Sequence, residues 1–214
     1  LFAASDGVRG TELWRTDGTS TGTWLVRDIV PGAGSSTPAE LVGVSGTWFF
    51  RNSSDGRLWK SDGTTSGTSQ VSATASSPTS LTNVGGTLFF SASGTNGTEL
   101  WKSDGTSAGT VQVKDINPSG NSSPANLFNF NGSLAFAANA GPTTTGIELW
   151  LSDGTGAGTV MLKDIYSTSG NGSPTGFAQV GSVLYFAATD AAGGTELWRT
   201  DGTTAGTVQV RDIN

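Results

Sequence analysis

The chain has 214 residues, of which 35% are hydrophobic and 13% charged, and its net charge is −6. This is too apolar for a disordered chain, and the acidic balance argues against nucleic acid, whose binding needs clustered Lys and Arg. No apolar run approaches the roughly 18 residues of a membrane span, and the absence of Cys and His excludes a disulfide framework and a Cys/His zinc site.

Five repeats are expected along the chain, at approximately 1–30, 31–74, 75–117, 118–166 and 167–214. Each contains a variant of Glu-Leu-Trp-x-x-Asp-Gly-Thr-x-x-Gly-Thr, with its tryptophan at Trp14, Trp59, Trp101, Trp150 or Trp198. The tryptophans recur about every 46 residues, the length of one four-stranded propeller blade. The chain begins at Leu1 without an initiator Met, so we expect it to be a processed or excised segment of something longer.

The third repeat illustrates the strands expected in each. Its β-prone runs lie at 81–84, 87–92, 98–102 and 110–116. The first two flank Gly85-Gly86, and a two-residue junction of this kind indicates a tight hairpin. Asn131-Gly132 is the strongest equivalent junction, because both central residues of a type I′ turn need positive φ. In the fourth strand, alternation places Val111 and Val113 on one face.

The sequence therefore predicts an all-β fold, a five-bladed β-propeller of four-stranded antiparallel blades forming a single domain over 1–214. A four-strand meander cannot bury both faces alone, and radial stacking covers them with neighbouring blades. No window has the apolar spacing of a helix. A linear β-solenoid is the alternative, which the two-residue hairpins disfavour.

The first repeat is short by one strand. Aligning Leu1 with Leu134 and Asn214 with Asn117 leaves 118–133 without a counterpart, a stretch holding one inter-blade loop and one first strand. We expect either a ring that closes with an incomplete blade, which we favour, or a window of a longer tandem array. An incomplete blade exposes a strand edge, which favours pairing with another chain.

The motif Glu99-Leu100-Trp101 with Asp104-Gly105-Thr106, continued by Lys114-Asp115-Ile116, resembles the bacterial ELWxxDGT-repeat family over essentially the whole chain. This resemblance implies a secreted or cell-surface bacterial protein and leaves the biochemical activity open. The turn is also similar to the Asp-box hairpin of sialidase-type propellers, but the spacing differs and no catalytic residue carries over.

The second repeat departs from the pattern. Arg57 stands where the other copies have Glu, and 72–74 replaces the Lys/Arg-Asp-Ile of the fourth strand. Because the two changes occur together, we hypothesise an ion pair between Glu99 and Lys114, and between their equivalents, on adjacent strands.

Two sets of aspartates are candidate sites. The turn aspartates are Asp17, Asp62, Asp104, Asp153 and Asp201; they either cap their turns or hold calcium, which prefers oxygen ligands. The strand-end aspartates are Asp28, Asp115, Asp164 and Asp212; they either cap strands, bind a ligand or ion, or supply the carboxylate pair of a glycosidase. Recurrence once per repeat favours the structural interpretation for both sets.

The repeated tryptophans are expected in the core. Trp24 and Trp48 fall outside the repeat pattern. Trp24 is a candidate ligand contact because aromatic faces stack on sugars, whereas Trp48 sits in an apolar run and is expected to be core.

We expect a non-enzymatic extracellular or cell-surface module for adhesion, assembly or matrix structure. The alternative is a lectin-like propeller that binds small glycans in repeated inter-blade pockets; a glycoside-processing enzyme is less favoured because His and Cys are absent. The expected partners are another copy of the chain through an open strand edge, or glycans. No cofactor is expected, and calcium is the alternative.

Overall fold

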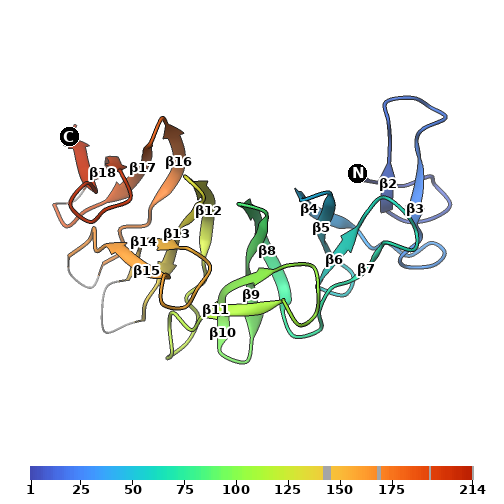
Figure 1. The fold of residues 1–214 in the computed structure, drawn as a ribbon, viewed down its shortest axis with the longest axis horizontal. Helices are drawn as coiled ribbons and strands as arrows, with labels where there is room; N and C mark the ends of the chain where they lie inside the picture. Colours follow the sequence, from blue (N-terminus) through green and yellow to red (C-terminus); the bar gives the residue numbers. More distant parts are fainter. Residues whose placement is uncertain (142–145, 168–169, 193, 214) are drawn as a thin grey trace.

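The structure is a computed structural model that describes residues 1–141, 146–167, 170–192 and 194–213. Antiparallel sheets lie side by side along a curved row, with the two ends of the chain at opposite ends of it (Figure 1). The described residues contain no helix, and thus none long and apolar enough to cross a membrane. The all-β fold built from repeated four-stranded sheets is confirmed.

Each repeat forms one group of consecutive strands, which we call a blade. The first blade contains β1 (Phe2–Ala4), β2 (Glu12–Arg15) and β3 (Trp24–Arg27). The second contains β4 (Pro38–Val44), β5 (Thr47–Asn52), β6 (Arg57–Ser61) and β7 (Ser69–Gln70). The third contains β8 (Ser76–Val84), β9 (Thr87–Gly94), β10 (Gly97–Ser103) and β11 (Val111–Lys114).

The fourth blade contains β12 (Ala125–Phe130), β13 (Ser133–Asn139), β14 (Ile147–Ser152) and β15 (Val160–Lys163), and the fifth contains β16 (Thr175–Val180), β17 (Val183–Thr189), β18 (Thr195–Thr200) and β19 (Val208–Arg211). The second and third blades are joined into one sheet by the pairing of Arg57 with Ser76. All pairings among the described strands are antiparallel, and all but this one join strands that are consecutive in the chain.

The predicted hairpins join the first two strands of the second to fifth blades. Asn131 and Gly132 have φ of 51° and 83°, and Gly85 and Gly86 have 57° and 86°, as a type I′ turn requires. At the hairpin of the fifth blade, Gly181-Ser182, only Gly181, at 60°, has positive φ. A single left-handed residue at the first central position is typical of a type II′ turn.

The predicted alternation along the fourth strand is wrong. A β-bulge between Leu100 and Trp101 shifts the register of β10 against β11. Because the bulge adds one residue, Val113 and Ile116 pack in the same apolar cluster while Val111 is exposed. The same bulge recurs between the third and fourth strands of the first, fourth and fifth blades.

The first blade has three strands, as expected, but its predicted alignment is off by one residue. Phe2 pairs with Trp14 in the way that Phe136 pairs with Trp150, so the counterpart of Phe2 is Phe136 and that of Leu1 is Ala135. The register follows the Phe-Ala-Ala triplet rather than the shared leucine. Asn214, the other residue of that alignment, lies outside the described residues.

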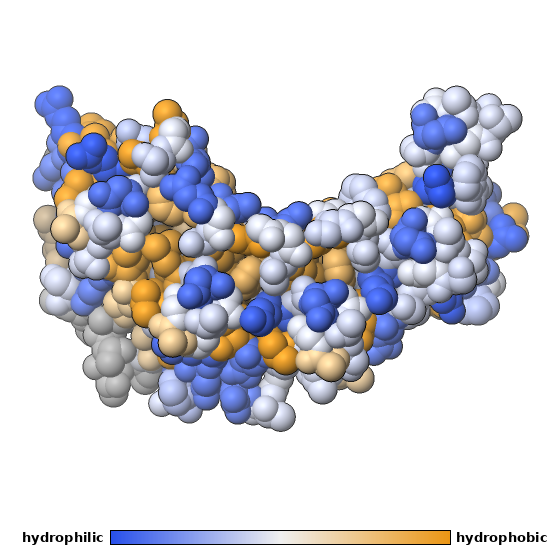
Figure 2. All heavy atoms as spheres, in the orientation of Figure 1, coloured by the Kyte–Doolittle hydropathy of each residue, from blue (hydrophilic) through white to orange (hydrophobic). Residues whose placement is uncertain are grey.

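The blades form an open arc rather than the closed ring that we favoured. The first strands β4, β8, β12 and β16 contact one another in succession, and β1 contacts β4. Side-chain amides bridge this row: Asn83 Nδ2 donates to the Gly43 carbonyl at 2.9 Å, and Asn129 Nδ2 to the Asn83 carbonyl at 3.3 Å. Ring closure depends on the angle between neighbouring blades, which no sequence period encodes. The arc leaves a concave side in the space-filling view (Figure 2).

The core lies between blades. At each junction, aliphatic residues from the third and fourth strands of one blade pack against a Phe and a Trp of the next. Leu149, Leu162 and Ile165 of the fourth blade meet Phe186 and Trp198 of the fifth. Leu100 and Ile116 meet Phe136 and Trp150 in the same way. The repeated tryptophans Trp101, Trp150 and Trp198 are buried, which confirms the expectation for these three, while Trp14 and Trp59 are half-buried.

Candidate functional site

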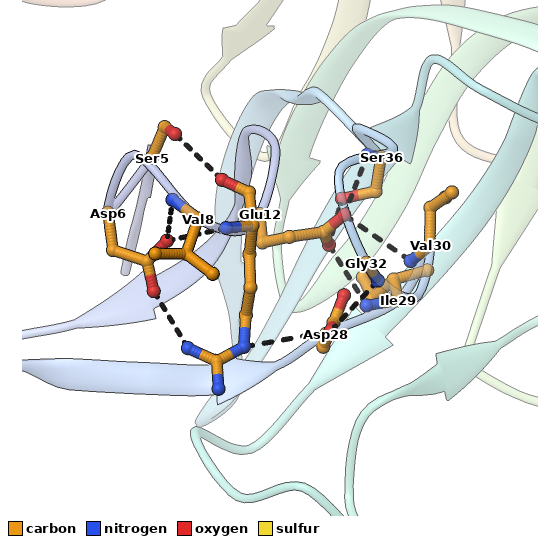
Figure 3. Close-up of polar contacts among 10 residues, drawn as sticks. Ser5, Asp6, Val8, Glu12, Asp28, Ile29, Val30, Gly32 and Ser36 are labelled. Atoms are coloured by element: carbon orange, nitrogen blue, oxygen red, sulfur yellow. Dashed lines mark hydrogen bonds and ion pairs between the residues drawn. The ribbon is translucent and has the colours of Figure 1, made fainter.

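The Glu of each Glu-Leu-Trp motif is a buried hydrogen-bond acceptor. Glu99 is fully buried, and its carboxylate accepts from Ile116 N–H at 2.9 Å, from Ser122 N–H at 3.0 Å and from Ser122 Oγ at 2.6 Å. Glu12 repeats the arrangement with Ile29 and Ser36 (Figure 3). The carboxylate thereby ties the end of the fourth strand to the loop that leads into the next blade.

Burial and hydrogen bonding act in opposite directions on these glutamates. Burial raises the pKa of Glu99 and of Glu148 above the ordinary value, although the N–H donors to both, and the Ser122 hydroxyl that donates to Glu99, favour the ionised form. Nearby Asp115 and Asp164 raise the pKa of Glu99 and Glu148 further. Each carboxylate is therefore a structural acceptor that is costly to bury and leave unpaired.

The predicted ion pair between Glu99 and Lys114 is wrong. Lys114 Nζ points to the following blade and donates to the Thr159 carbonyl oxygen at 2.7 Å. Glu99 finds its donors in backbone N–H groups and Ser122 instead. Among the described residues, the only salt bridges join Arg9 to Asp6 and to Asp28.

Basic side chains of the third strand also cross to the next blade. Lys60 Nζ donates to the Gly105 carbonyl and Lys102 Nζ to the Gly154 carbonyl, both at 2.8 Å. Arg15 reaches the Gly63 carbonyl at 3.3 Å. Because each acceptor is the glycine of an Asp-Gly-Thr turn, the motif contributes to the junction as well as to its own hairpin.

The turn aspartates cap their own hairpins. Asp104 Oδ1 accepts from Thr106 N–H at 2.8 Å and from Thr106 Oγ1 at 2.7 Å, and the other four turns repeat this pair of bonds. Gly105 has φ of 88°, and a Cβ on Gly109 would overlap the Asp104 carboxylate. These contacts lower the pKa of all five aspartates, with the Thr hydroxyl as the largest cause.

The strand-end aspartates lie at equivalent positions, one per blade, and the structure does not bring them together as a pair. The Oδ1 atoms of Asp28, Asp115 and Asp164 are buried without a hydrogen-bond partner, whereas Asp212 is exposed. Burial raises the pKa of Asp164. No group of three or more acidic side chains that could hold a metal occurs in the described part of the chain.

In the second blade, the side chain at the position of the buried glutamate is a hydrogen-bond donor instead of an acceptor. Arg57 donates to the Ala73 carbonyl at 2.6 Å and to the Ala75 carbonyl at 3.5 Å. A guanidinium that donates to carbonyls thus replaces a carboxylate that accepts from N–H groups. This explains why Arg57 and the altered 72–74 segment occur in the same repeat.

Trp24 and Trp48 are both exposed. Trp24 is 45% exposed, but it occupies the first position of the fourth strand, where Val111, Val160 and Val208 are exposed too. The Arg15 guanidinium covers its ring at 4.5 Å from the centroid. Trp48 is 37% exposed, so its expected place in the core is wrong: it points away from the junction that Phe49 fills.

Equivalent hollows lie at two neighbouring junctions. One, of about 200 Å³, is lined by Phe89, Lys102 and Asp153, and another, of about 230 Å³, by Phe49 and Asp104. Pockets for small ligands usually span about 300–1,000 Å³. Phe49 and Phe89 are only 2% and 3% exposed, so neither ring offers a face on which a sugar could stack.

The far face of the fifth blade is apolar and uncovered. Leu197 is 42% exposed, whereas its counterparts Leu13, Leu58, Leu100 and Leu149 are all 0%. Ile213 is 75% exposed, against 5% for both Ile116 and Ile165. Val180 and Val210 are exposed on the same blade, whereas their counterparts in the fourth blade, Phe130 and Leu162, are buried. Hydrophobic residues are visible at this end of the molecule in Figure 2.

No protein-family model and no curated protein matches the chain. Among solved structures, the computationally designed Ika8 protein superposes with a TM-score of 0.53 at 16% identity, covering 97% of this chain and 59% of that one. A puromycin-hydrolyzing peptidase of Mycobacterium tuberculosis gives 0.55 at 12% identity, covering 90% and 30%. The S511A mutant of a puromycin hydrolase gives 0.52 at 13%, covering 91% and 31%. At these identities the likeness concerns the fold alone.

The uncovered face of the fifth blade was missed in the sequence. Its residues carry the same letters as buried residues elsewhere, since Leu197 stands in the same Glu-Leu-Trp motif as Leu149. The signal was nevertheless available: in a row of stacked blades, the outermost copy of a junction-forming set has no neighbour in the row.

Proposed function

We propose that this chain is a non-enzymatic repeat module of a secreted or cell-surface protein and that its role is assembly. The engagement of the repeated Glu, Asp and Lys side chains in building blades and junctions carries the proposal. The resemblance to ELWxxDGT-repeat proteins is the support for the extracellular location.

The use of the repeated polar residues supports the same role. The buried glutamates, the turn aspartates and three basic residues of the third strand, Arg15, Lys60 and Lys102, are engaged in building blades and junctions. A catalytic site would instead need groups free to reach a substrate. The strand edge of β1, which pairs only with β2 in the described residues, offers a second route to association.

Sedimentation velocity over a wide concentration range tests the proposal. We expect the weight-average sedimentation coefficient to rise with concentration for the wild-type chain. It should stay at the monomer value for Leu197→Asp. Val160→Asp is the matched control, since Val160 is 46% exposed on an inner blade away from the end face. A wild-type chain that stays monomeric at every concentration would refute the assembly role.

The equivalent junction hollows favour a second candidate, the binding of small glycans. One hollow is lined by Lys102 and Asp153 and the other by Asp104, and these polar groups suit a hydroxylated ligand, but the phenylalanine rings in both are covered. A glycan array tests this candidate, with Lys102→Leu as the variant that should lose any signal. An array without any bound glycan would eliminate it.

A further inference from the structure

The two junction hollows have neighbours inside the blades. A hollow of about 360 Å³ in the second blade is lined by Thr47, Lys60 and Asp62. Another, of about 320 Å³ in the third blade, is lined by residues at the same repeat positions, Thr87, Lys102 and Asp104. The two threonines each follow a two-residue hairpin and begin the second strand of their blade. The same set of side chains therefore lines a hollow in both blades.

Adjacent hollows share side chains, so the four hollows form one continuous track. Thr47 lines both the second-blade hollow and the junction hollow beside it. Asp104 lines that junction hollow and the third-blade hollow. Thr87 and Lys102 line the third-blade hollow and the next junction hollow, which also includes Asp153. The track thus crosses the second, third and fourth blades, which lie in a row (Figure 1).

The track offers hydrogen-bonding groups that the fold does not use. The hydroxyl groups of Thr47 and Thr87, both half-buried residues, make no hydrogen bond to any residue that the structure describes. The turn contacts of Asp104 use Oδ1, and its Oδ2 atom accepts no bond within the described residues. The same holds for Asp62 and Asp153. All three aspartates are exposed, so these oxygen atoms are available to a ligand.

Charges of both signs alternate along the track. Lys60 shares its hollow with Asp62 and donates to the turn that contains Asp104. Lys102 shares one hollow with Asp104 and the next with Asp153. Each ammonium group has three donors, of which its contact with a glycine carbonyl uses one. A polymer with charges of one sign would meet a like charge in every repeat, whereas a neutral chain rich in hydroxyl groups would find both donors and acceptors.

We propose that the track binds a neutral linear polysaccharide, with different parts of one sugar chain in adjoining hollows. The free threonine hydroxyls and aspartate Oδ2 atoms bond the sugar hydroxyls, and Val111, which is 39% exposed beside the third-blade hollow, supplies an apolar contact. Because equivalent groups recur from blade to blade, affinity increases with the length of the sugar chain. The inference rests on the second candidate function, glycan binding, and is independent of the assembly role.

Affinity electrophoresis and titration calorimetry of the full chain test the proposal. The neutral probes are amylose, β-1,3-glucan and β-mannan, each compared with its own disaccharide, and the charged probes are alginate and polylysine. We expect at least one neutral polymer to bind at least about tenfold more tightly than its disaccharide. Tighter binding of alginate or polylysine than of every neutral polymer would overturn the assignment of a neutral ligand.

The variant that combines Thr47→Val with Thr87→Val locates the binding to the track. It removes two hydroxyl groups that the fold does not use, and the fifth blade already carries Val183 at the corresponding position. We expect the affinity for the polymer to fall about tenfold while the urea midpoint stays unchanged. Thr175→Val is the matched control, since Thr175 is exposed and lines none of these hollows; it should bind like the wild-type chain.

The outcomes separate the track from glycan binding in general. A disaccharide that binds as tightly as its polymer would leave glycan binding in place and overturn the track. Unchanged polymer affinity in the double threonine variant would do the same, because the sugar would then lie elsewhere on the molecule. Absence of binding to every neutral polymer and disaccharide would overturn both.

Discussion

The Arg57 guanidinium donates a hydrogen bond of 2.6 Å to the carbonyl oxygen of Ala73. At the corresponding place in the third blade, Glu99 accepts a bond of 2.9 Å from the N–H of Ile116. Both contacts fasten the chain as it leaves the fourth strand, but they use backbone groups of opposite polarity. Side chain and backbone path must therefore change together, and exchanging only one of them should be unfavourable.

Arg57→Glu should destabilise the second blade. The substitution removes a charged hydrogen bond and sets a carboxylate against the Ala73 and Ala75 carbonyl groups, so we expect a loss of about 1–3 kcal/mol in the free energy of unfolding. Urea denaturation measures it. Arg57→Lys keeps a donor and should lose less; an unchanged midpoint for Arg57→Glu would contradict the inverted polarity.

Glu99→Gln should lower the free energy of unfolding by about 2–4 kcal/mol, since the new amide NH2 group must face an N–H donor in a fully buried position. Ser122→Ala is the matched variant that removes only the hydroxyl contact, and it should cost less. Thermal and urea unfolding give both values. A loss below that of Ser122→Ala would mean that the carboxylate is replaceable.

A double-mutant cycle on Glu99 and Lys114 should give additive effects within about 0.5 kcal/mol. The two side chains share no hydrogen-bond partner, since one accepts from Ile116 and Ser122 and the other reaches Thr159. A coupling energy above about 1 kcal/mol would restore the ion pair that the structure contradicts.

Acid should unfold the chain partly through its turn aspartates. Their pKa values are lowered on folding from the ordinary value of 3.8, so the stability they contribute is complete above that value and is lost as pH falls through the folded pKa. The urea midpoint should drop between about pH 5 and pH 2. Asp104→Asn should make the fall of the urea midpoint with pH less steep. An unchanged slope would exclude Asp104 as a contributor to the acid sensitivity. Glu99 and Glu148 have the opposite sign, since their raised pKa values favour the folded state at lower pH.

Much of the fold follows from local chemistry. Paired residues with positive φ, such as Asn131-Gly132, fix the hairpins, and Asp104 with Gly105 and Gly109 fixes the last turn of its blade. The linked loss of Glu and Lys-Asp-Ile in the second repeat correctly marked a coupled contact. Its partner was misjudged because the acceptor for Lys114 and the donors to Glu99 are largely backbone groups, which leave no trace in a sequence.

Other features depend on neighbours that a single repeat does not reveal. Val113 changes face because of a bulge beside Leu100, and a strict alternation rule has no room for an inserted residue. Trp48 lies in an apolar run, yet the strand pleat sends it outward while Phe49 fills the junction. The open arc reflects the angle between blades, which many small packing contacts determine together.

Because contacts in this molecule run from each blade to the next, its stability approximates a chain of nearest-neighbour couplings. An inner blade is held at two junctions and the fifth blade at one. Fluctuations should therefore begin at the ends and spread inward, with the amides of β18 and β19 exchanging with solvent before those of β9 and β10. A further blade packed on the fifth would remove one of the two points from which unfolding starts. Resistance to unfolding should therefore increase with the number of blades in the row.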